Sequence, residues 1–249
     1  MTPLDCIARG FPGRAAFDTA VSRALLDAVA RGELSETLRL YRPDDVVAFS
    51  GTDAHRPGFR DAVAAARAAG FDASLRLAGG SAALFTQQSL AFGWCRPDPE
   101  PRAGIHERFA EMADLVAGAL RDLGVDAQVG AVPGEYCPGD YSVNDGRGRK
   151  LMGVGQRIVR GAAWVGGVIV VGGAARADAV LEPVYRALGL PYTGRATGAV
   201  EDAAGAEVDV DTVRDALLAR IASERGVAES DFAPAVLEAA ARGEARHRV

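Results

Sequence analysis

A thiol, a carboxylate and an ammonium stand close together in one short segment of this chain. Cys137, Asp140 and Lys150 fall within residues 134–157, where two extended runs flank a polar turn rich in Gly, Asp and Arg. This pattern predicts a β-hairpin whose second strand begins at Lys150. A lysine fixed there can face a bound anion, and small neighbours such as Gly153 leave room for a ligand against the strand. The segment therefore predicts an active site.

Cys137 and Lys150 each allow a second interpretation. Free cysteines are commonly small buried fillers of a core, and most lysines are exposed cations. A cysteine between Tyr136 and Pro138 on a polar loop is less easily explained as a filler. A nearby cation such as Lys150 or Arg149 would lower the pKa of the thiol from about 8.5 and so raise the fraction of nucleophilic thiolate.

Other chemistry has less support in the sequence. The three cysteines, Cys6, Cys95 and Cys137, are far apart and lack the paired spacing of a zinc site or a disulfide framework. The three histidines are equally scattered, which gives a histidine-based metal site or a serine–histidine triad little to build on. We therefore expect no metal site built from these residues.

Hydrophobic periodicity predicts the elements that position the segment. Apolar residues at helical spacing predict helices at residues 15–31, between Pro57 and Gly70, and at 106–123, 179–188, 210–224 and 234–242. Extended runs predict strands at residues 37–41, 46–50, 73–77, 82–92, 127–129, 141–144, 150–158 and 162–171.

The order of these elements favours an α+β fold. Strands cluster and helices flank them, without the regular strand–helix alternation of a doubly wound sheet. After residue 171 the pattern changes to helices, which we expect to pack as a C-terminal extension on the same domain. Residues 1–249 are thus expected to form a single domain, with a core at about residues 15–190 and an extension at about residues 191–249.

Two motifs resemble the lipoate-protein ligase and octanoyltransferase family, which has the biotin/lipoate protein ligase catalytic domain. Residues 148–157 read G-R-K-L-M-G-V-G-Q-R, similar to the family's G-R-K-I-x-G-x-A-Q-R. Residues 76–84 read R-L-A-G-G-S-A-A-L, similar to its R-x-S/T-G-G-x-A-V loop. Residues 37–41 and 46–51 resemble the two strands that follow its first helix. The resemblance implies a mixed, largely antiparallel sheet covered by helices, and a single catalytic domain.

The resemblance also implies a role for the upstream loop. In the family the Gly-Gly pair lets the backbone approach the acyl chain and carboxyl of the ligand. Gly79 and Gly80, with Ser81 beside them, would thus bind the carboxyl end of lipoate or octanoate. Arg76 would neutralise that carboxylate or an attached phosphate.

For the downstream motif the resemblance implies two competing mechanisms. Lys150, beside Gly153, would contact the acyl carbonyl or an adenylate phosphate and stabilise developing oxyanion charge. Cofactor-free members hold the acyl group as a thioester on a cysteine just upstream, here Cys137. ATP-using members place an Asn-Asp pair near this point to organise Mg²⁺ and phosphate, and Asp140 is the aspartate present. A ligase would need ATP and Mg²⁺, whereas a cysteine transferase would need neither.

Three positions depart from the family pattern. Leu75 replaces a frequent second arginine, Ala78 replaces Ser or Thr, and Phe85 stands where many members have histidine. These departures support an alternative function, a non-catalytic module that binds an acyl or biotin-like ligand.

Composition limits the partners. The chain of 249 residues has a formal charge of −5 with both signs interspersed, which gives no electrostatic footprint for nucleic acid or an anionic membrane. The longest apolar run, residues 162–175, is broken by glycines and is shorter than the roughly 20 residues of a membrane span. The N-terminal residues show neither the basic nor the apolar region of an export signal, which predicts a cytoplasmic location.

Together these features predict an enzyme that moves a lipoyl or octanoyl group to a lysine of a lipoyl-type carrier domain. The acyl group would come from free lipoate or octanoate or from an acyl-carrier donor, and it would pass through an activated intermediate in a largely apolar slot.

Overall fold

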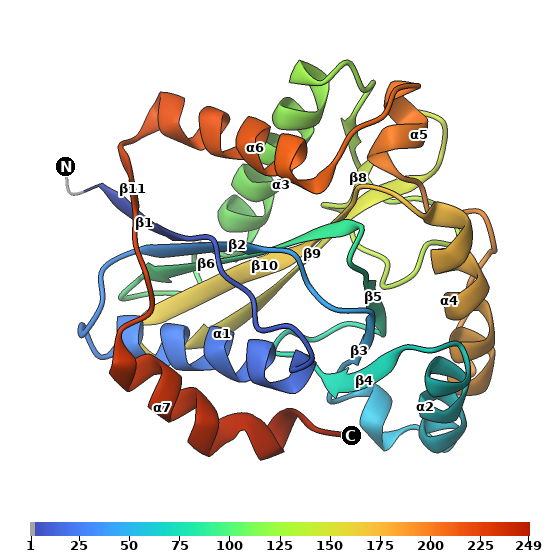
Figure 1. Cartoon of the computed structure of the whole chain (residues 1–249), viewed down its shortest axis with the longest axis horizontal. Helices are drawn as coiled ribbons and strands as arrows, with labels where there is room; N and C mark the ends of the chain where they lie inside the picture. The colour runs from blue at the N-terminus through green and yellow to red at the C-terminus, as the bar shows by residue number, and fades with distance from the viewer. Residues whose placement is uncertain (1–2) are drawn as a thin grey trace.

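Eight strands from both ends and the middle of the chain form one large sheet in the computed structural model, which describes residues 3–249 (Figure 1). Its spatial order is β11-β1-β2-β6-β10-β9-β8-β7. The strands are β1 (Leu4–Ile7), β2 (Thr37–Tyr41), β6 (Ser89–Pro97), β7 (Gln128–Val129), β8 (Val143–Asn144), β9 (Lys150–Val159), β10 (Ala162–Val170) and β11 (Val227–Glu229). Pairing is antiparallel except at one edge, where β1 runs parallel to both β2 and β11.

A second sheet has three strands in the order β4-β3-β5. These are β3 (Val46–Phe49), β4 (Asp72–Leu75) and β5 (Ala83–Phe85), with β3 parallel to β4 and antiparallel to β5. The chain passes from β4 to β5 through the Gly79-Gly80 loop. The small sheet therefore holds this loop against the large one.

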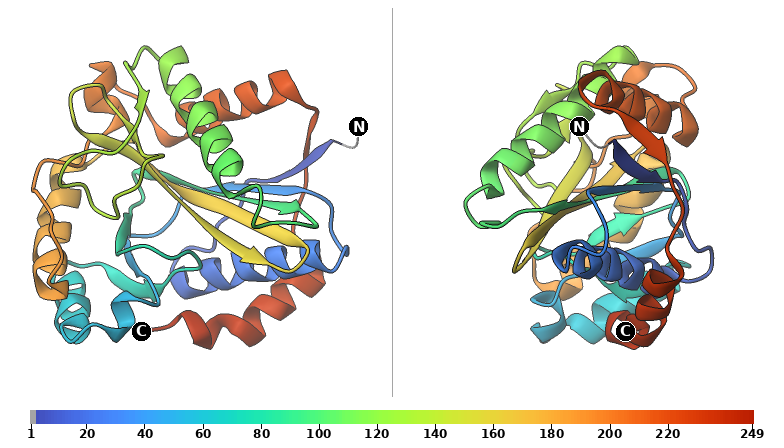
Figure 2. Two further views of the ribbon diagram at one scale, coloured as in Figure 1. Left: turned by 180° about the vertical axis from the view of Figure 1, so that it is seen from behind. Right: turned by 90° about the vertical axis from the view of Figure 1, so that its left-hand side faces the viewer.

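Helices cover both sheets (Figure 2). They are α1 (Ala15–Ala30), α2 (Phe59–Ala68), α3 (Ile105–Asp122), α4 (Ala174–Leu188), α5 (Val200–Ala204), α6 (Val210–Glu224) and α7 (Pro234–Gly243). The right-hand view shows α3 and α6 on one side of the large sheet and α1 and α7 on the other. The small sheet packs with α2 and α4 around its own apolar cluster.

The predicted α+β class, with a mixed, largely antiparallel sheet flanked by helices, is confirmed, and the helices α6 and α7 lie in the C-terminal part as expected. The predicted hairpin is confirmed as the antiparallel pair β8–β9, with Lys150 at the start of β9. The run at residues 82–92, predicted as one strand or a pair of strands, is a pair, β5 and β6, whose strands belong to different sheets. Strands β1 and β11 were not predicted, and β11 lies inside the extension that the sequence suggested was helical.

The last residues of the chain bind to both parts of the molecule. Strand β11 pairs with β1 at the edge of the large sheet, and α7 then packs against α1. Beyond α7, Arg248 forms an isolated antiparallel bridge with Ser74 of β4. His247 Nδ1 lies 3.0 Å from the carbonyl oxygen of Leu75. Residues 227–248 thus contact both sheets, the large one at β1 and the small one at β4.

No helix in the described part of the chain is long and apolar enough to cross a membrane. The prediction that the N-terminus lacks an export signal rests partly on residues 1 and 2, which lie outside the described residues.

Candidate active site

The loop between β7 and β8 carries Cys137 and holds its backbone in an unusual conformation. Cys137 has φ of +42°, in the left-handed region that side-chain-bearing residues rarely adopt. Its N–H donates to the Tyr185 hydroxyl at 2.6 Å, and that hydroxyl donates to the carbonyl of Ala82 at 2.6 Å. Because Tyr185 is on α4 and Ala82 precedes β5, this relay joins the cysteine loop to the small sheet.

The thiol of Cys137 lies against the Gly79-Gly80 loop. Its Sγ accepts hydrogen bonds from Arg76 Nη2 at 3.0 Å and from the Ser81 N–H at 3.4 Å. Arg76 also donates to the carbonyl of Gly79. A Cβ at Gly80 would lie 2.7 Å from Cys137 Sγ, and Gly80 has φ of +91°. Only glycine therefore lets the loop bend this way and approach the sulfur so closely.

These neighbours change the acidity of the thiol. Burial alone would raise the pKa of Cys137. The positive charges of Arg76 and Lys150, together with the hydrogen bond from the Ser81 N–H, outweigh it and lower the pKa below its usual value. The thiol is thus biased toward its nucleophilic form.

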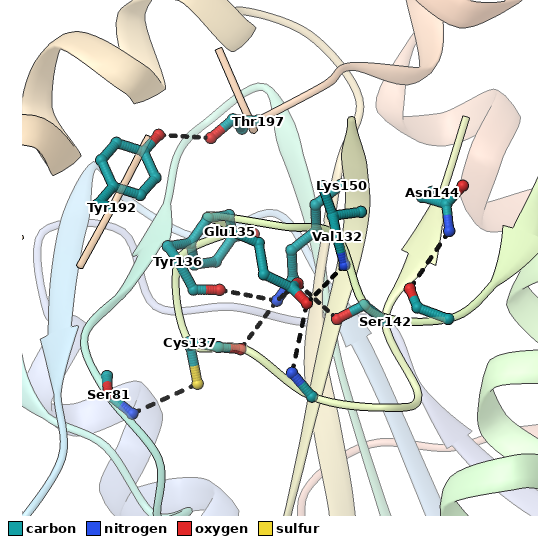
Figure 3. A network of polar contacts seen from close by, with 12 residues as sticks. Ser81, Val132, Glu135, Tyr136, Cys137, Ser142, Asn144, Lys150, Tyr192 and Thr197 are labelled. Carbon is teal, nitrogen blue, oxygen red and sulfur yellow. Dashed lines mark hydrogen bonds and ion pairs between the residues drawn. The ribbon is translucent and has the colours of Figure 1, made fainter. Parts of the chain in front are cut away.

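Lys150 is buried beneath the cysteine loop (Figure 3). Its Nζ lies 2.6 Å from Glu135 Oε2 and donates to the carbonyls of Tyr136 at 2.9 Å and Cys137 at 3.0 Å. Burial lowers the pKa of this ammonium, and the negative charge of Glu135 opposes that effect. An ammonium has three N–H donors, so these three oxygens use all of them.

Glu135 organises the loop around Cys137. Besides Lys150, its carboxylate accepts hydrogen bonds from the Val132 N–H at 3.0 Å, the Ser142 hydroxyl at 2.7 Å and the Gly139 N–H at 3.4 Å. Its side chain is fully buried. A buried carboxylate that binds a cation and three donors fixes the path of the backbone on both sides of the thiol.

Sequence reasoning missed Glu135 and Tyr185. A single glutamate in a polar loop is usually a solvated charge, and a tyrosine at helical spacing is usually core. Lys150 was expected to face a bound anion. In the structure the anion beside it is the carboxylate of Glu135.

A slot lined mainly by apolar groups opens beside the thiol. Cys137, Arg76 and Gly153 line it. Much of the rest is apolar or glycine, including Leu77, Ala78, Phe92, Gly155, Trp164 and Val168. Such a lining fits the hydrocarbon part of an acyl group.

The structure brings most of the predicted site residues together. Cys137, Arg76, Gly80 and Ser81 meet at the sulfur, and Lys150 lies directly behind them. Gly153 lies beside Lys150, since a Cβ there would be 3.3 Å from Nζ. Asp140 is exposed on the same loop and is not among the described residues that line the slot. Cys6 and Cys95 are buried elsewhere, in two separate core clusters.

Comparison with known proteins identifies the class. Residues 14–222 match the family model of the lipoyl protein ligase A/B catalytic domain, so the chain belongs to this family, as its motifs predicted. It is 29% identical over 170 residues to an octanoyl-GcvH:protein N-octanoyltransferase from Geobacillus kaustophilus, an alignment that covers 68% of this chain and 60% of that protein. The chain thus spans less than two thirds of the length of the curated relatives it matches first.

Two solved structures share the fold over nearly their whole length. A lipoate-protein ligase A bound with ATP has a TM-score of 0.80 and 21% identity, and the match covers 98% of this chain and 95% of that chain. A bi-partite lipoate protein ligase from Thermoplasma acidophilum, studied with its E2 lipoyl domain, has a TM-score of 0.75 and 18% identity, with 99% and 93% covered. At these identities the likeness establishes the fold.

Proposed function

We propose that this chain is an acyltransferase that moves an octanoyl or lipoyl group from a carrier-bound thioester to a lysine of a lipoyl-type carrier domain, with Cys137 as nucleophile. The observation that carries the proposal is the thiol beside an apolar slot, with its pKa lowered by Arg76 and Lys150. The name of the Geobacillus relative describes the transfer of an octanoyl group from one protein, GcvH, to another. We also propose that residues 1–249 act as one catalytic domain located in the cytoplasm.

The transfer takes two displacement steps. The Cys137 thiolate attacks the carbonyl carbon of the donor thioester, and the donor leaves as a thiolate that takes a proton from water. The amine of the acceptor lysine then attacks the acyl group on Cys137. The amide bond forms, Cys137 leaves as a thiolate, and the proton of the amine passes to water. A thioester preserves the activation of the donor, so neither step needs a nucleotide.

The groups around the sulfur have separate parts in this scheme. Arg76 and the Ser81 N–H stabilise the thiolate before attack and after each displacement. Gly79 and Gly80 let the backbone come close to the carboxyl end of the acyl group, and Gly153 leaves space on the other side. We keep the prediction that Lys150 stabilises the oxyanion, because the positive charge of Lys150 lies directly behind the Cys137 carbonyl.

A ligase that uses ATP and Mg²⁺ fits these residues less well. In the ligase scheme Lys150 would bind an adenylate phosphate, but its three donors are already bound to Glu135 and two backbone carbonyls. Asp140, the aspartate proposed to help hold Mg²⁺, lies on an exposed part of the loop and is not among the described residues that line the slot. We therefore favour direct transfer from Cys137 and derive no step through ATP.

The test is incubation of the purified protein with octanoyl-acyl carrier protein, in which the octanoyl group is held as a thioester, without ATP, followed by intact-mass analysis. A hydroxylamine-sensitive octanoyl adduct is expected on the peptide that contains Cys137, and its octanoyl group should pass to a lipoyl-type domain added later. Cys137→Ser should abolish both, whereas Cys95→Ser should form the adduct at the wild-type rate.

Two other outcomes would identify the alternatives. If Cys137→Ser keeps full activity and turnover requires ATP and Mg²⁺, the chain is a ligase and the thiol is structural. If octanoate binds but no donor, with or without ATP, modifies a lipoyl-type domain, the chain is the non-catalytic binding module.

A further inference from the structure

Three glycines stand in a row across the middle of the large sheet. Gly93 of β6 is directly opposite Gly166 of β10, and Gly166 is directly opposite Gly155 of β9. Glycine inside a strand is costly, because it loses more conformational freedom on folding than other residues and packs no side chain. Three such glycines in register leave a strip of the sheet without side chains. Another group is therefore expected to pack on this strip.

The indole of Trp164 occupies two thirds of this strip. A Cβ at Gly93 would lie 2.5 Å from the indole Nε1, and a Cβ at Gly166 would lie 2.2 Å from its Cζ2. Both positions are thus closed to any side chain while the indole lies there. Trp164 is two residues from Gly166 on β10, so its ring lies along the sheet toward the active site.

The indole does not cover the third glycine, which lies against Ala78 instead. A Cβ at Gly155 would have a single described atom within 4 Å, the Cβ of Ala78 at 2.8 Å. The indole therefore stops short of Gly155. Two residues further toward the reactive end, Gly153 lies against Lys150. This spacing along β9 corresponds to about 7 Å.

The slot accordingly has a reactive end and a closed end. Cys137 and Arg76 line it beside Gly153, and Trp164 lines it beyond Gly155. An acyl chain attached to Cys137 and running past Gly153 and Ala78, which both line the slot, would meet the edge of the indole. A longer chain would have to displace the ring from its seat on Gly93 and Gly166.

We propose that the indole of Trp164 is the end wall of the acyl slot and sets the upper limit of the acyl chain length. This inference rests on the proposed function, and it names the residue that excludes saturated chains longer than octanoyl from the slot. Each methylene that enters an apolar site contributes about fourfold to binding. Removal of the wall should thus favour a chain longer by two methylenes about fifteenfold.

The experiment compares octanoyl, decanoyl and dodecanoyl groups on the same carrier as donors to the purified protein. The rate of adduct formation on Cys137 is followed by intact mass. In Trp164→Ala the decanoyl-to-octanoyl rate ratio should rise about fifteenfold over wild type. Trp94→Phe is the matched control, because Trp94, the only other tryptophan, packs in the core cluster of α3 and α6. Its ratio should equal that of wild type.

The possible results separate the two proposals. If wild type forms no adduct with any donor, the proposed function fails and this inference fails with it. If wild type forms the octanoyl adduct but Trp164→Ala keeps the wild-type ratio, only the end wall is wrong. Trp164→Leu replaces the alanine variant if circular dichroism shows that the latter is unfolded, and it should shift the ratio in the same direction by a smaller factor.

Discussion

The loop around Cys137 and the strand around Cys95 both place a thiol within the protein, but they treat it in opposite ways. Cys95 lies on β6 in the apolar layer under α1, where burial raises the pKa of its thiol. Burial likewise raises the pKa of Cys6, to about 11. At Cys137 two cations and a backbone N–H reverse the effect of burial. The pKa of a thiol in this chain thus depends on the charges near it, because all three cysteines are substantially buried and only Cys137 has a lowered pKa.

Removing the charge behind Cys137 is the strongest way to break this contrast. Lys150→Ala should lower the rate of acyl transfer about 10²–10³-fold. It should also destabilise the fold by about 3–5 kcal/mol, because Glu135 is left buried without its cation. Acyl transfer to a lipoyl-type domain and urea unfolding measure the two effects.

The double variant Glu135→Gln with Lys150→Met separates these effects. It removes both charges, keeps an acceptor for the Val132 and Gly139 N–H groups, and places an amide N–H that can donate to the Ser142 hydroxyl. It should therefore regain most of the stability while activity stays low. Arg23→Gln is the control, because it breaks a half-exposed ion pair with Asp27 and should cost less than about 1 kcal/mol. Wild-type activity in the double variant would contradict the role given to the charge.

A smaller change tests how closely the backbone must approach the sulfur. Gly80→Ala places a Cβ 2.7 Å from Cys137 Sγ at a residue with φ of +91°. It should cost about 1–2 kcal/mol and slow adduct formation, because Arg76 or the thiol has to move. Gly51→Ala is the matched control, since nothing lies within 4 Å of its Cβ position among the described residues. Equal behaviour of the two variants would rule out the close approach.

The pH dependence of thiol alkylation sharpens the contrast further. Since the pKa of Cys137 is lowered, its reaction with iodoacetamide should persist at pH values where Cys95 is inert. Arg76→Met removes one of the cations, so the pKa of Cys137 should rise and the midpoint should move to higher pH. The rate at neutral pH should then fall several-fold. Peptide mass analysis distinguishes the two cysteines, and an unchanged midpoint would show that Arg76 does not set the thiol pKa.

Much of the fold was predictable from the sequence because its long elements carry strong local patterns. Helices α1, α3 and α6 and strands β2, β9 and β10 lie within a residue or two of their predicted bounds. Strands β1 and β11 were missed because each is short and because their parallel pairing joins distant parts of the chain, for which no local pattern exists. The strand pairing at this edge of the large sheet therefore depends on tertiary contacts.

The site was predictable where its residues fall in motifs. Cys137 and Lys150 were singled out by residue type and spacing, and Arg76 by the family resemblance. The structure brings the three residues together, and their roles stay predictions. Glu135 was missed because nothing in a loop sequence indicates that a carboxylate will be buried. The packing of the Trp164 indole on the glycine strip was missed for a related reason, since this packing depends on the register of three strands.

The pairing of β11 with β1 also bears on how the protein is made. A ribosome synthesises about 5–20 residues each second, and early segments begin to fold before later ones emerge. Strand β1 leaves the ribosome well before its neighbour β11 and the residues that bridge to β4. Until those residues emerge, the outer edge of β1 stays open to solvent, where unpaired strand edges invite aggregation. The pairing of β11 with β1 therefore closes this edge of the sheet only after the segments between the two strands have been synthesised.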